Sequence, residues 1–304
     1  MSEKNKYKGI LPAFFACYDK QGDIDPERVE TLAKYYLDAG VKGLYVGGSS
    51  GECIYQTIKE RKLVLEHVMK AVGGQMTVIA HIAAPSTAAS IELARHAEKL
   101  GVDALAAIPP IYYVLPEYAI EKYWADIVSS TELDFFIYNI PSTTGYSLSP
   151  TLFQRMLSHP QVVGVKNSSA PVQDIYLLRA AQTRDTIIFN GVDEQYLGGR
   201  IMGADGGIGS TYGLMPKLYI ELDKAFVKQD IRLAQKIQGA INEIIFKVLN
   251  CDGNLYDIMK KILKNKDNLE LGEVREPLPR ASAEDEIVMD EIAVLIDEAE
   301  ERYC

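Results

Sequence analysis

The chain has few cysteines and no long hydrophobic segment. Its four cysteines, Cys17, Cys53, Cys251 and Cys304, lie far apart, without a CxxC pair and without a histidine at ligand spacing. This spacing argues against a disulfide framework and a zinc site, so we expect free thiols in a reducing cytoplasm. No apolar run reaches the roughly 18 residues that a membrane span needs. The N-terminal stretch MSEKNKYKG also lacks the apolar core of a signal peptide.

An excess of positive charge is also absent. The 32 lysines and arginines face 42 aspartates and glutamates, which gives a net charge of −10. Nucleic acids and anionic membranes bind through positive charge, so we expect neither as a partner. Hydrophobic residues make up 47% of the 304 residues, enough for a large core. The length suits a single α/β barrel, which typically needs about 250 residues.

Eight short apolar segments predict eight buried strands. Most are continuous runs without alternation, which is typical of parallel strands covered on both faces. Helix signals lie between them, such as the N-cap pair Asp25-Pro26 and a capping box from Thr57 to Glu60. The predicted strands are Ile10–Cys17, Gly43–Gly47, Met76–Ile82, Ala104–Pro109, Asp134–Ile140, Val162–Asn167, Thr186–Gly191 and Gly206–Ser210.

A glycine-containing joint recurs between predicted helices and strands. Gly40, Gly101 and Gly203 each stand where a helix ends in a residue of positive φ. Eight repeated β-α units in about 200 residues predict a (β/α)8 TIM barrel of the α/β class, with an open doubly wound sheet as the alternative. We assign the barrel to residues 1–215 and a C-terminal helical appendage packed on it to residues 216–304. Its expected helices are Pro216–Val227, Ile231–Leu249, Tyr256–Leu263 and Glu284–Glu301.

In such a barrel the active site lies at the C-terminal ends of the strands, so polar residues there are candidates. Lys166 is the most informative, because it follows a buried valine-rich run, and desolvation turns a lysine amine into a nucleophile. A lysine that extends to the surface or pairs with a carboxylate is the alternative. The other strand ends supply Ser49, Ser50, Tyr112, Tyr113, Tyr138, Asp193, Glu194 and Ser210.

Three segments resemble motifs of other enzyme classes. Gly47–Gly51 matches the GxSxG pattern of serine hydrolases, but the next helix begins only at the Thr57 cap and no histidine is a clear partner. Gly203–Gly209 looks like a dinucleotide-binding loop, yet it precedes a strand, so close backbone packing explains it better. The pair Asp193-Glu194 lacks a histidine for a metal site and suits a helix start or sugar hydroxyls. We therefore expect no metal and no cofactor.

Five motifs, in their order and spacing, resemble those of the N-acetylneuraminate lyase and dihydrodipicolinate synthase superfamily. The resemblance covers residues 8 to about 215 and, more loosely, the C-terminal helices. It implies a class I aldolase that works without a cofactor and assembles as a homotetramer. The motifs are GGSSGE (Gly47–Glu52), YNIP (Tyr138–Pro141), GVKNSS (Gly164–Ser169), NGVDE (Asn190–Glu194) and GADGGIGSTY (Gly203–Tyr212).

The same resemblance implies a role for each candidate residue. Lys166 is the Schiff-base lysine and Tyr138 is the phenol that transfers protons. Tyr113, or its neighbour Tyr112, matches the tyrosine that family members lend to a neighbouring subunit's site. Ser49 and Ser50 are implied to bind the keto-acid carboxylate. The residues implied to hold a sugar chain are Ser168, Gly191, Asp193, Glu194 and Ser210.

Two segments separate the branches of this superfamily. Dihydrodipicolinate synthases have an arginine after the YN-P motif, where it holds the carboxylate of an aldehyde, and this chain has Thr143 there. The DE and GADGGIGSTY segments are similar to sialic acid lyases, although Ser50 stands where many of those have threonine. We expect a 2-keto acid and a sugar aldehyde as ligands, from cleavage of N-acetylneuraminate to pyruvate and N-acetylmannosamine. Another pyruvate-dependent aldolase, or a non-catalytic keto-acid or sugar sensor, is the alternative.

Overall fold

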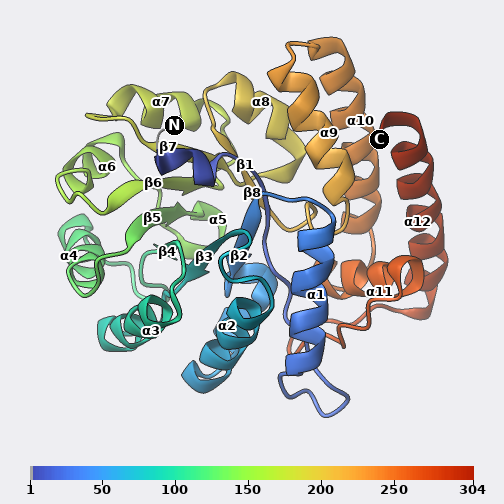
Figure 1. Cartoon of the computed structure of the whole chain (residues 1–304), viewed down its shortest axis with the longest axis horizontal. Helices are drawn as coiled ribbons and strands as arrows, with labels where there is room; N and C mark the ends of the chain where they lie inside the picture. Colours follow the sequence, from blue (N-terminus) through green and yellow to red (C-terminus); the bar gives the residue numbers. More distant parts are fainter. Residues whose placement is uncertain (1–2) are drawn as a thin grey trace.

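The computed structural model describes residues 3–304, so Met1 and Ser2, the first residues of the predicted barrel segment, lie outside the described residues. Within that range, eight parallel strands alternate with helices, in the sheet order β1-β8-β7-β6-β5-β4-β3-β2 (Figure 1). The strands are β1 (Gly9–Pro12), β2 (Gly43–Val46), β3 (Thr77–His81), β4 (Ala104–Ala107), β5 (Asp134–Asn139), β6 (Val162–Asn167), β7 (Ile187–Asn190) and β8 (Gly206–Gly209).

The sheet closes between its first and second strands. Ala13 forms a parallel bridge with Tyr45. The backbone N–H of Lys42 donates to the Ile10 carbonyl at 2.9 Å, and that of Phe14 donates to the Tyr45 carbonyl at 2.9 Å. The prediction of a (β/α)8 TIM barrel is therefore confirmed, and the open doubly wound sheet is excluded.

All eight predicted strands are present in the described residues, but the first is shorter than predicted. β1 ends at Pro12, whereas the apolar run continues to Cys17. The backbone groups after Ala13 bond to other segments: Ala16 N–H donates to the Ser50 carbonyl at 3.2 Å, and Tyr18 N–H donates to the Leu271 carbonyl at 2.9 Å. An apolar run marks burial both in a strand of the sheet and in a buried segment that bonds elsewhere. The sequence pattern therefore does not show where the strand ends.

The helices around the barrel begin at the signals seen in the sequence. Asp25 caps α1 (Pro26–Asp38), and Thr57 with Glu60 forms a capping box on α2 (Ile58–Val72). The other helices before β8 are α3 (Thr87–Leu100), α4 (Glu117–Val128), α5 (Pro141–Thr144), α6 (Pro150–Met156), α7 (Gln173–Ala181) and α8 (Tyr196–Ile201). The 3-10 helices are η1 (Glu3–Tyr7), η2 (Ser49–Gly51), η3 (Cys53–Tyr55) and η4 (Asp193–Gln195).

Helices α9 (Pro216–Val227), α10 (Ile231–Leu249), α11 (Leu255–Asp267) and α12 (Ala283–Tyr303) follow the last strand. α9 contacts β1, whereas α10, α11 and α12 contact one another beside it, as Figure 1 shows. α9 thus occupies the place of the eighth barrel helix, inside the segment that the sequence assigns to the appendage. The division at residue 215 stays a prediction.

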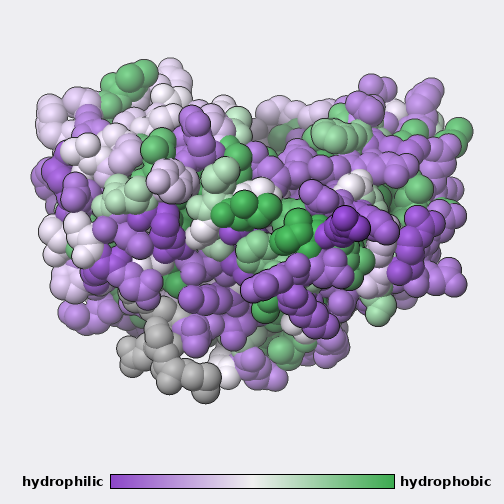
Figure 2. Space-filling model, turned by 90° about the horizontal axis from the view of Figure 1, so that it is seen from above, coloured by the Kyte–Doolittle hydropathy of each residue, from purple (hydrophilic) through white to green (hydrophobic). Residues whose placement is uncertain are grey.

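Side chains form two hydrophobic clusters. The smaller one fills the barrel and includes Tyr45, Phe136 and Tyr138, and the larger one lies between the barrel and its helices. Figure 2 shows a face where hydrophilic side chains dominate and hydrophobic ones gather near the middle. Among residues 3–304 no helix is both long and apolar enough to cross a membrane.

Candidate active site

Lys166 is the penultimate residue of β6, and its side chain lies inside the barrel mouth with an exposed fraction of 4%. Its Nζ lies 4.0 Å from the ring centroid of Tyr138 on β5 and 4.4 Å from that of Tyr45 on β2. Burial lowers the pKa of Lys166 from 10.5 to about 7, and the negative charge of Asp193 raises it slightly in return. Much of the amine is therefore unprotonated near neutral pH, which makes it a nucleophile.

Tyr138 lies opposite Lys166 in the β5–β6 ladder and is buried. Burial raises the pKa of its phenol to about 12, and hydrogen bonds with the hydroxyls of Ser168 and Ser49 lower it. The phenol therefore keeps its proton at neutral pH and belongs to a chain of hydroxyl groups. Such a group can relay a proton to and from a substrate beside Lys166.

The turn after β6 is fastened to both neighbouring strands. The backbone N–H of Ser168 donates to the Asn139 carbonyl at 2.7 Å, and its hydroxyl donates to the Gly191 carbonyl at 3.1 Å. A Cβ atom at position 191 would lie 2.1 Å from the Ser168 Oγ. Glycine at this position therefore lets the serine hydroxyl lie beside Tyr138.

The turn after β2 carries two hydroxyl groups. Ser49 is exposed and bonds toward Tyr138, whereas Ser50 is buried. The Ser50 side chain is hydrogen-bonded to the phenol of Tyr256, which comes from α11. The C-terminal helices thus contribute directly to this side of the mouth. Two hydroxyls held in this way suit a carboxylate ligand.

Asp193 is buried at the other side of the mouth. Its Oδ2 accepts hydrogen bonds from the backbone N–H of Thr211 at 2.8 Å and from the Thr211 hydroxyl at 2.7 Å. Burial raises the pKa of Asp193 to about 6, and the bonds from Thr211 lower it. One carboxylate oxygen is therefore occupied by Thr211, whereas the other, Oδ1, packs against Gly209, where a Cβ atom would lie 1.9 Å from it. Glu194 and Ser210 are only partly buried next to it.

Tyr113 does not join the site of its own chain. It lies on the loop after β4 with an exposed fraction of 73%, and its ring packs edge-on against Tyr112 at 5.0 Å. Tyr112 is 91% exposed and has a φ of 81°. Two adjacent exposed aromatic rings on a loop are unusual for a surface that contacts only solvent.

Sequence reasoning missed Tyr45 and His81, because both lie inside predicted strands and not after them. The imidazole of His81 lies within hydrogen-bonding distance of the Gly47 carbonyl, 2.8 Å, and burial lowers its pKa to about 3. It is therefore neutral, and its ring contacts those of Tyr45 and Tyr138 at centroid distances of 6.0 and 5.9 Å. The available signal was a polar aromatic residue within an otherwise apolar strand.

A cavity of about 600 Å³ opens beside these residues, at the C-terminal ends of β2, β3 and β4. Most of its lining is apolar. Its polar side chains include Ser49, His81, Thr143 and Tyr256, and also Glu52, Gln56, Thr57, Arg61 and Ser86. The hydroxyl of Thr143 donates to the Ile140 carbonyl at 3.3 Å.

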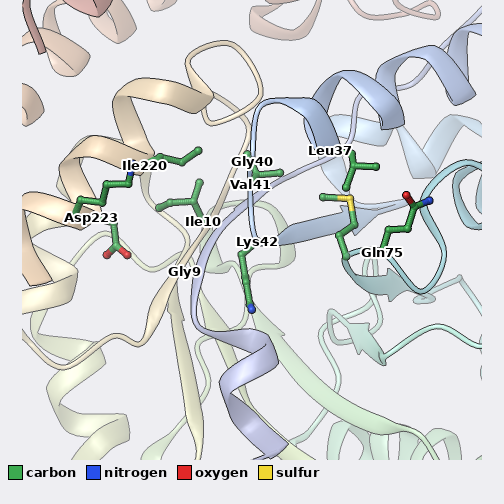
Figure 3. Close-up of a pocket in the computed structure, with 11 residues that line it drawn as sticks. Gly9, Ile10, Leu37, Gly40, Val41, Lys42, Gln75, Ile220 and Asp223 are labelled. Atoms are coloured by element: carbon green, nitrogen blue, oxygen red, sulfur yellow. The ribbon is translucent and has the colours of Figure 1, made fainter. Parts of the chain in front are cut away.

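Another cavity, of about 430 Å³, lies at the opposite end of the barrel, near Gly9 and Lys42 (Figure 3). Its Asp223 is bonded to the Tyr196 phenol at 2.6 Å. Because strand N-termini line this cavity, it is separate from the mouth. In the described part of the chain, no three His, Cys, Asp or Glu side chains come together as a metal site.

Comparisons with known proteins agree with this geometry. The model of the dihydrodipicolinate synthetase family matches residues 6–294. An N-acetylneuraminate lyase from Mediterraneibacter gnavus is 54% identical over 100% of this chain and 96% of its own length. The solved structure of a Ruminococcus gnavus sialic acid aldolase with a mutated catalytic lysine has a TM-score of 0.98 at 53% identity and covers 100% of both chains. An N-acetylneuraminate lyase from Salmonella agona is 34% identical over 89% of this chain and 91% of its own.

Proposed function

The chain belongs to the dihydrodipicolinate synthetase family, and we propose that it cleaves N-acetylneuraminate to pyruvate and N-acetylmannosamine through a Schiff base on Lys166. It is a carbon-carbon lyase of the class I aldolase type. The observation that carries the proposal is the buried amine of Lys166 beside the Tyr138 phenol. Lys260, another buried lysine, forms an ion pair with Glu52, whereas Lys166 has no ion-pair partner in the described part of the chain.

The reaction begins when the neutral Lys166 amine attacks the ketone of the open-chain sugar acid. Loss of water leaves a protonated iminium, which accepts the electron pair of the C3–C4 bond as that bond breaks. Tyr138 takes the proton of the C4 hydroxyl while its own proton passes to the substrate carboxylate at Ser49 and Ser50, so no free phenolate is needed. The resulting enamine is protonated at C3, and water then releases pyruvate and restores the amine.

The sugar chain extends to the opposite side of the mouth in this proposal. Gly191 and Glu194 offer oxygen acceptors, and Ser168 and Ser210 offer hydroxyls. Asp193 contributes through its charge, because Thr211 occupies Oδ2 and Oδ1 packs against Gly209. Thr143 provides no positive charge for an aldehyde carboxylate, which favours a polyhydroxylated sugar over aspartate semialdehyde.

We also propose that the chain works as a homotetramer in the cytoplasm. The exposed residues Tyr112, Tyr113 and Val114 form an apolar loop tip that suits burial against another copy and its site. The four cysteines are free, and burial raises the pKa of each of the four thiols, which suits a reducing compartment. Light scattering together with activity at increasing dilution tests the assembly.

The proposed function is tested by trapping the imine. Borohydride in the presence of pyruvate should add one pyruvate-derived mass per chain, located on Lys166. The Lys166→Arg variant should lose both trapping and turnover, because a guanidinium stays protonated. Trapping at another lysine, such as Lys260, would reject the mechanism. Trapping without turnover of any sialic acid would leave the sensor alternative.

A panel of aldehyde substrates distinguishes a sialic acid lyase from a dihydrodipicolinate synthase. With pyruvate as the partner, kcat/KM should be higher for N-acetylmannosamine than for aspartate semialdehyde. The opposite order would favour another pyruvate-dependent aldolase of the family, while leaving the Schiff-base step intact.

A further inference from the structure

Two tyrosine rings form a corner around the nitrogen of Lys166. The Nζ lies 4.0 Å from the Tyr138 ring centroid and 4.4 Å from the Tyr45 ring centroid. The two ring planes meet at 82° with their centroids 5.7 Å apart. Both rings come from the barrel interior, and Tyr45 is completely buried.

The mechanism gives Tyr138 a task, but it leaves Tyr45 without one. The Tyr45 hydroxyl is buried and has no hydrogen-bond partner among the described residues. An unpaired buried hydroxyl is costly, so a leucine or phenylalanine would be the simpler way to fill this space. What Tyr45 offers to Lys166 is the electron-rich face of its ring.

The position of the Tyr45 ring is fixed by its surroundings. Its backbone forms the bridge to Ala13 that closes the barrel. Its ring contacts His81 on one side, and a Cβ atom at position 48 would lie 2.7 Å from the Tyr45 Cε1. Glycine at position 48 therefore leaves room for the Tyr45 ring in the position where it faces Lys166.

Few other groups balance a positive charge at this nitrogen. Asp193 acts on Lys166 through its charge but forms no ion pair with it in the described residues, and His81 is neutral. Tyr138 and Tyr45 are both protonated, because burial raises the pKa of each phenol. The two ring faces, at 4.4 and 4.0 Å from the nitrogen, thus place negative potential directly against it.

We propose that Tyr45 is a further catalytic residue, whose ring face stabilises the positive charge of the protonated iminium on Lys166. This inference rests on the proposed function. Imine formation consumes one amine, one ketone and one proton and gives one iminium and one water, so a cation appears in a buried site. A cation over an aromatic face is attracted by the ring quadrupole, most strongly where water is excluded.

The experiment compares the imine equilibrium in Tyr45→Phe and Tyr45→Leu, read as the pyruvate concentration that half-saturates borohydride trapping on Lys166. Tyr45→Phe should stay within about twofold of the parent chain, and Tyr45→Leu should need roughly tenfold more pyruvate, the size of a desolvated cation–π contact. Position 45 can also carry a phenylalanine with one to five fluorine atoms on its ring. Each added fluorine should shift the equilibrium further away from the imine, since fluorine withdraws electron density from the ring face. This series keeps the ring volume, so it remains informative if the leucine variant fails to fold.

A matched control is Tyr36→Leu, because Tyr36 is also fully buried with an unpartnered hydroxyl but packs on Phe14 in the larger cluster, outside the barrel interior. It should lower the free energy of unfolding without changing the imine equilibrium. An unchanged imine in Tyr45→Leu and in the fluorinated series would overturn the inference. If Tyr45→Phe weakens imine formation as much as Tyr45→Leu does, the effect belongs to the hydroxyl and not to the ring face, and the inference is overturned as well.

A second measurement separates this inference from the proposed function. The pKa of Lys166 without substrate, measured from the pH dependence of its acetylation, should fall in Tyr45→Leu and stay unchanged in Tyr45→Phe. If the parent chain does not trap pyruvate, the proposed function fails and the catalytic role fails with it. If it traps pyruvate while this pKa is the same in all variants, only the role of Tyr45 fails.

Discussion

The Nζ of Lys260 lies 3.2 Å from the Oε1 of Glu52, and both side chains are almost completely buried. Lys260 belongs to α11, and Glu52 directly follows the turn that carries Ser49 and Ser50. The same Nζ donates to the Glu273 carbonyl at 3.1 Å. This ion pair therefore fastens the proposed carboxylate-binding turn to the C-terminal helices.

Removal of one partner from this pair should be costly. Lys260→Met should lower the free energy of unfolding by about 3–5 kcal/mol, because it leaves the Glu52 carboxylate buried without a counter-charge. The turn should loosen as well, so KM for pyruvate should rise more than kcat falls. Urea unfolding and steady-state kinetics measure the two effects. Lys217→Met is the control, since its ion pair with Glu300 is exposed on the lysine side and is worth less than about 1 kcal/mol. Equal effects of the two variants would contradict the expectation.

Lys166→Met should abolish turnover and stabilise the fold at neutral pH. The pKa of Lys166 is about 7 in the folded chain and 10.5 as a free side chain, so the unfolded state binds more protons between these values. The burial penalty is full below pH 7 and disappears as the pH rises through 10.5. The gain should be a few kcal/mol at pH 7, on the order of 1.4 kcal/mol for each pKa unit, and it should shrink at pH 10. Thermal unfolding at both pH values measures it. A variant less stable than the parent chain at pH 7 would mean that the lysine is not strained by burial.

Asp193→Asn should move the acidic limb of the pH profile to lower pH. The charge of Asp193 raises the pKa of Lys166, so its removal lets that pKa fall further below 7. The amide retains an oxygen for the Thr211 donors. Imine trapping measured from pH 5 to pH 9 reports the shift. Asp223→Asn, at the opposite end of the barrel, should leave the profile unchanged. A shift to higher pH in Asp193→Asn would show that another group controls the amine.

Thr143→Arg should change the choice of aldehyde. Thr143 lines the cavity beside Ser49, and a guanidinium there would offer two hydrogen bonds and a charge to a carboxylate. The kcat/KM for aspartate semialdehyde should rise relative to that for N-acetylmannosamine, by roughly tenfold, within the range of a charged hydrogen bond. Thr143→Lys is the control, because an ammonium adds a positive charge without the two parallel N–H donors of a guanidinium. A ratio unchanged in both variants would place the aldehyde away from Thr143.

Local sequence signals were sufficient to predict the strands and helices of the barrel. The capping box at Thr57 and Glu60 and the positive φ of Gly101 involve residues within one turn of each other, so the sequence reveals them directly. Buried parallel strands leave a continuous apolar run wherever they occur. The first strand shows the limit of this signal, since the apolar run continues to Cys17, whereas Ala16 already bonds to the turn at Ser50 and not to a neighbouring strand.

The sequence by itself determined which chemistry the mouth contains. Lys166, Tyr138 and the serines at 49 and 50 were identified because they follow apolar runs, and strand ends meet at one edge of a barrel. The resemblance of the motifs added their proposed roles. None of this depends on knowing which side chains touch.

The tertiary structure alone decided the surroundings of each of these groups. Tyr45 and Lys166 are 121 positions apart in the sequence, and Lys260 and Glu52 are 208 apart. Their contacts exist because the sheet closes at Tyr45 and because α11 docks on the turn after β2. Burial and long-range charge set the pKa of Lys166, and both depend on packing that no local pattern of residues encodes.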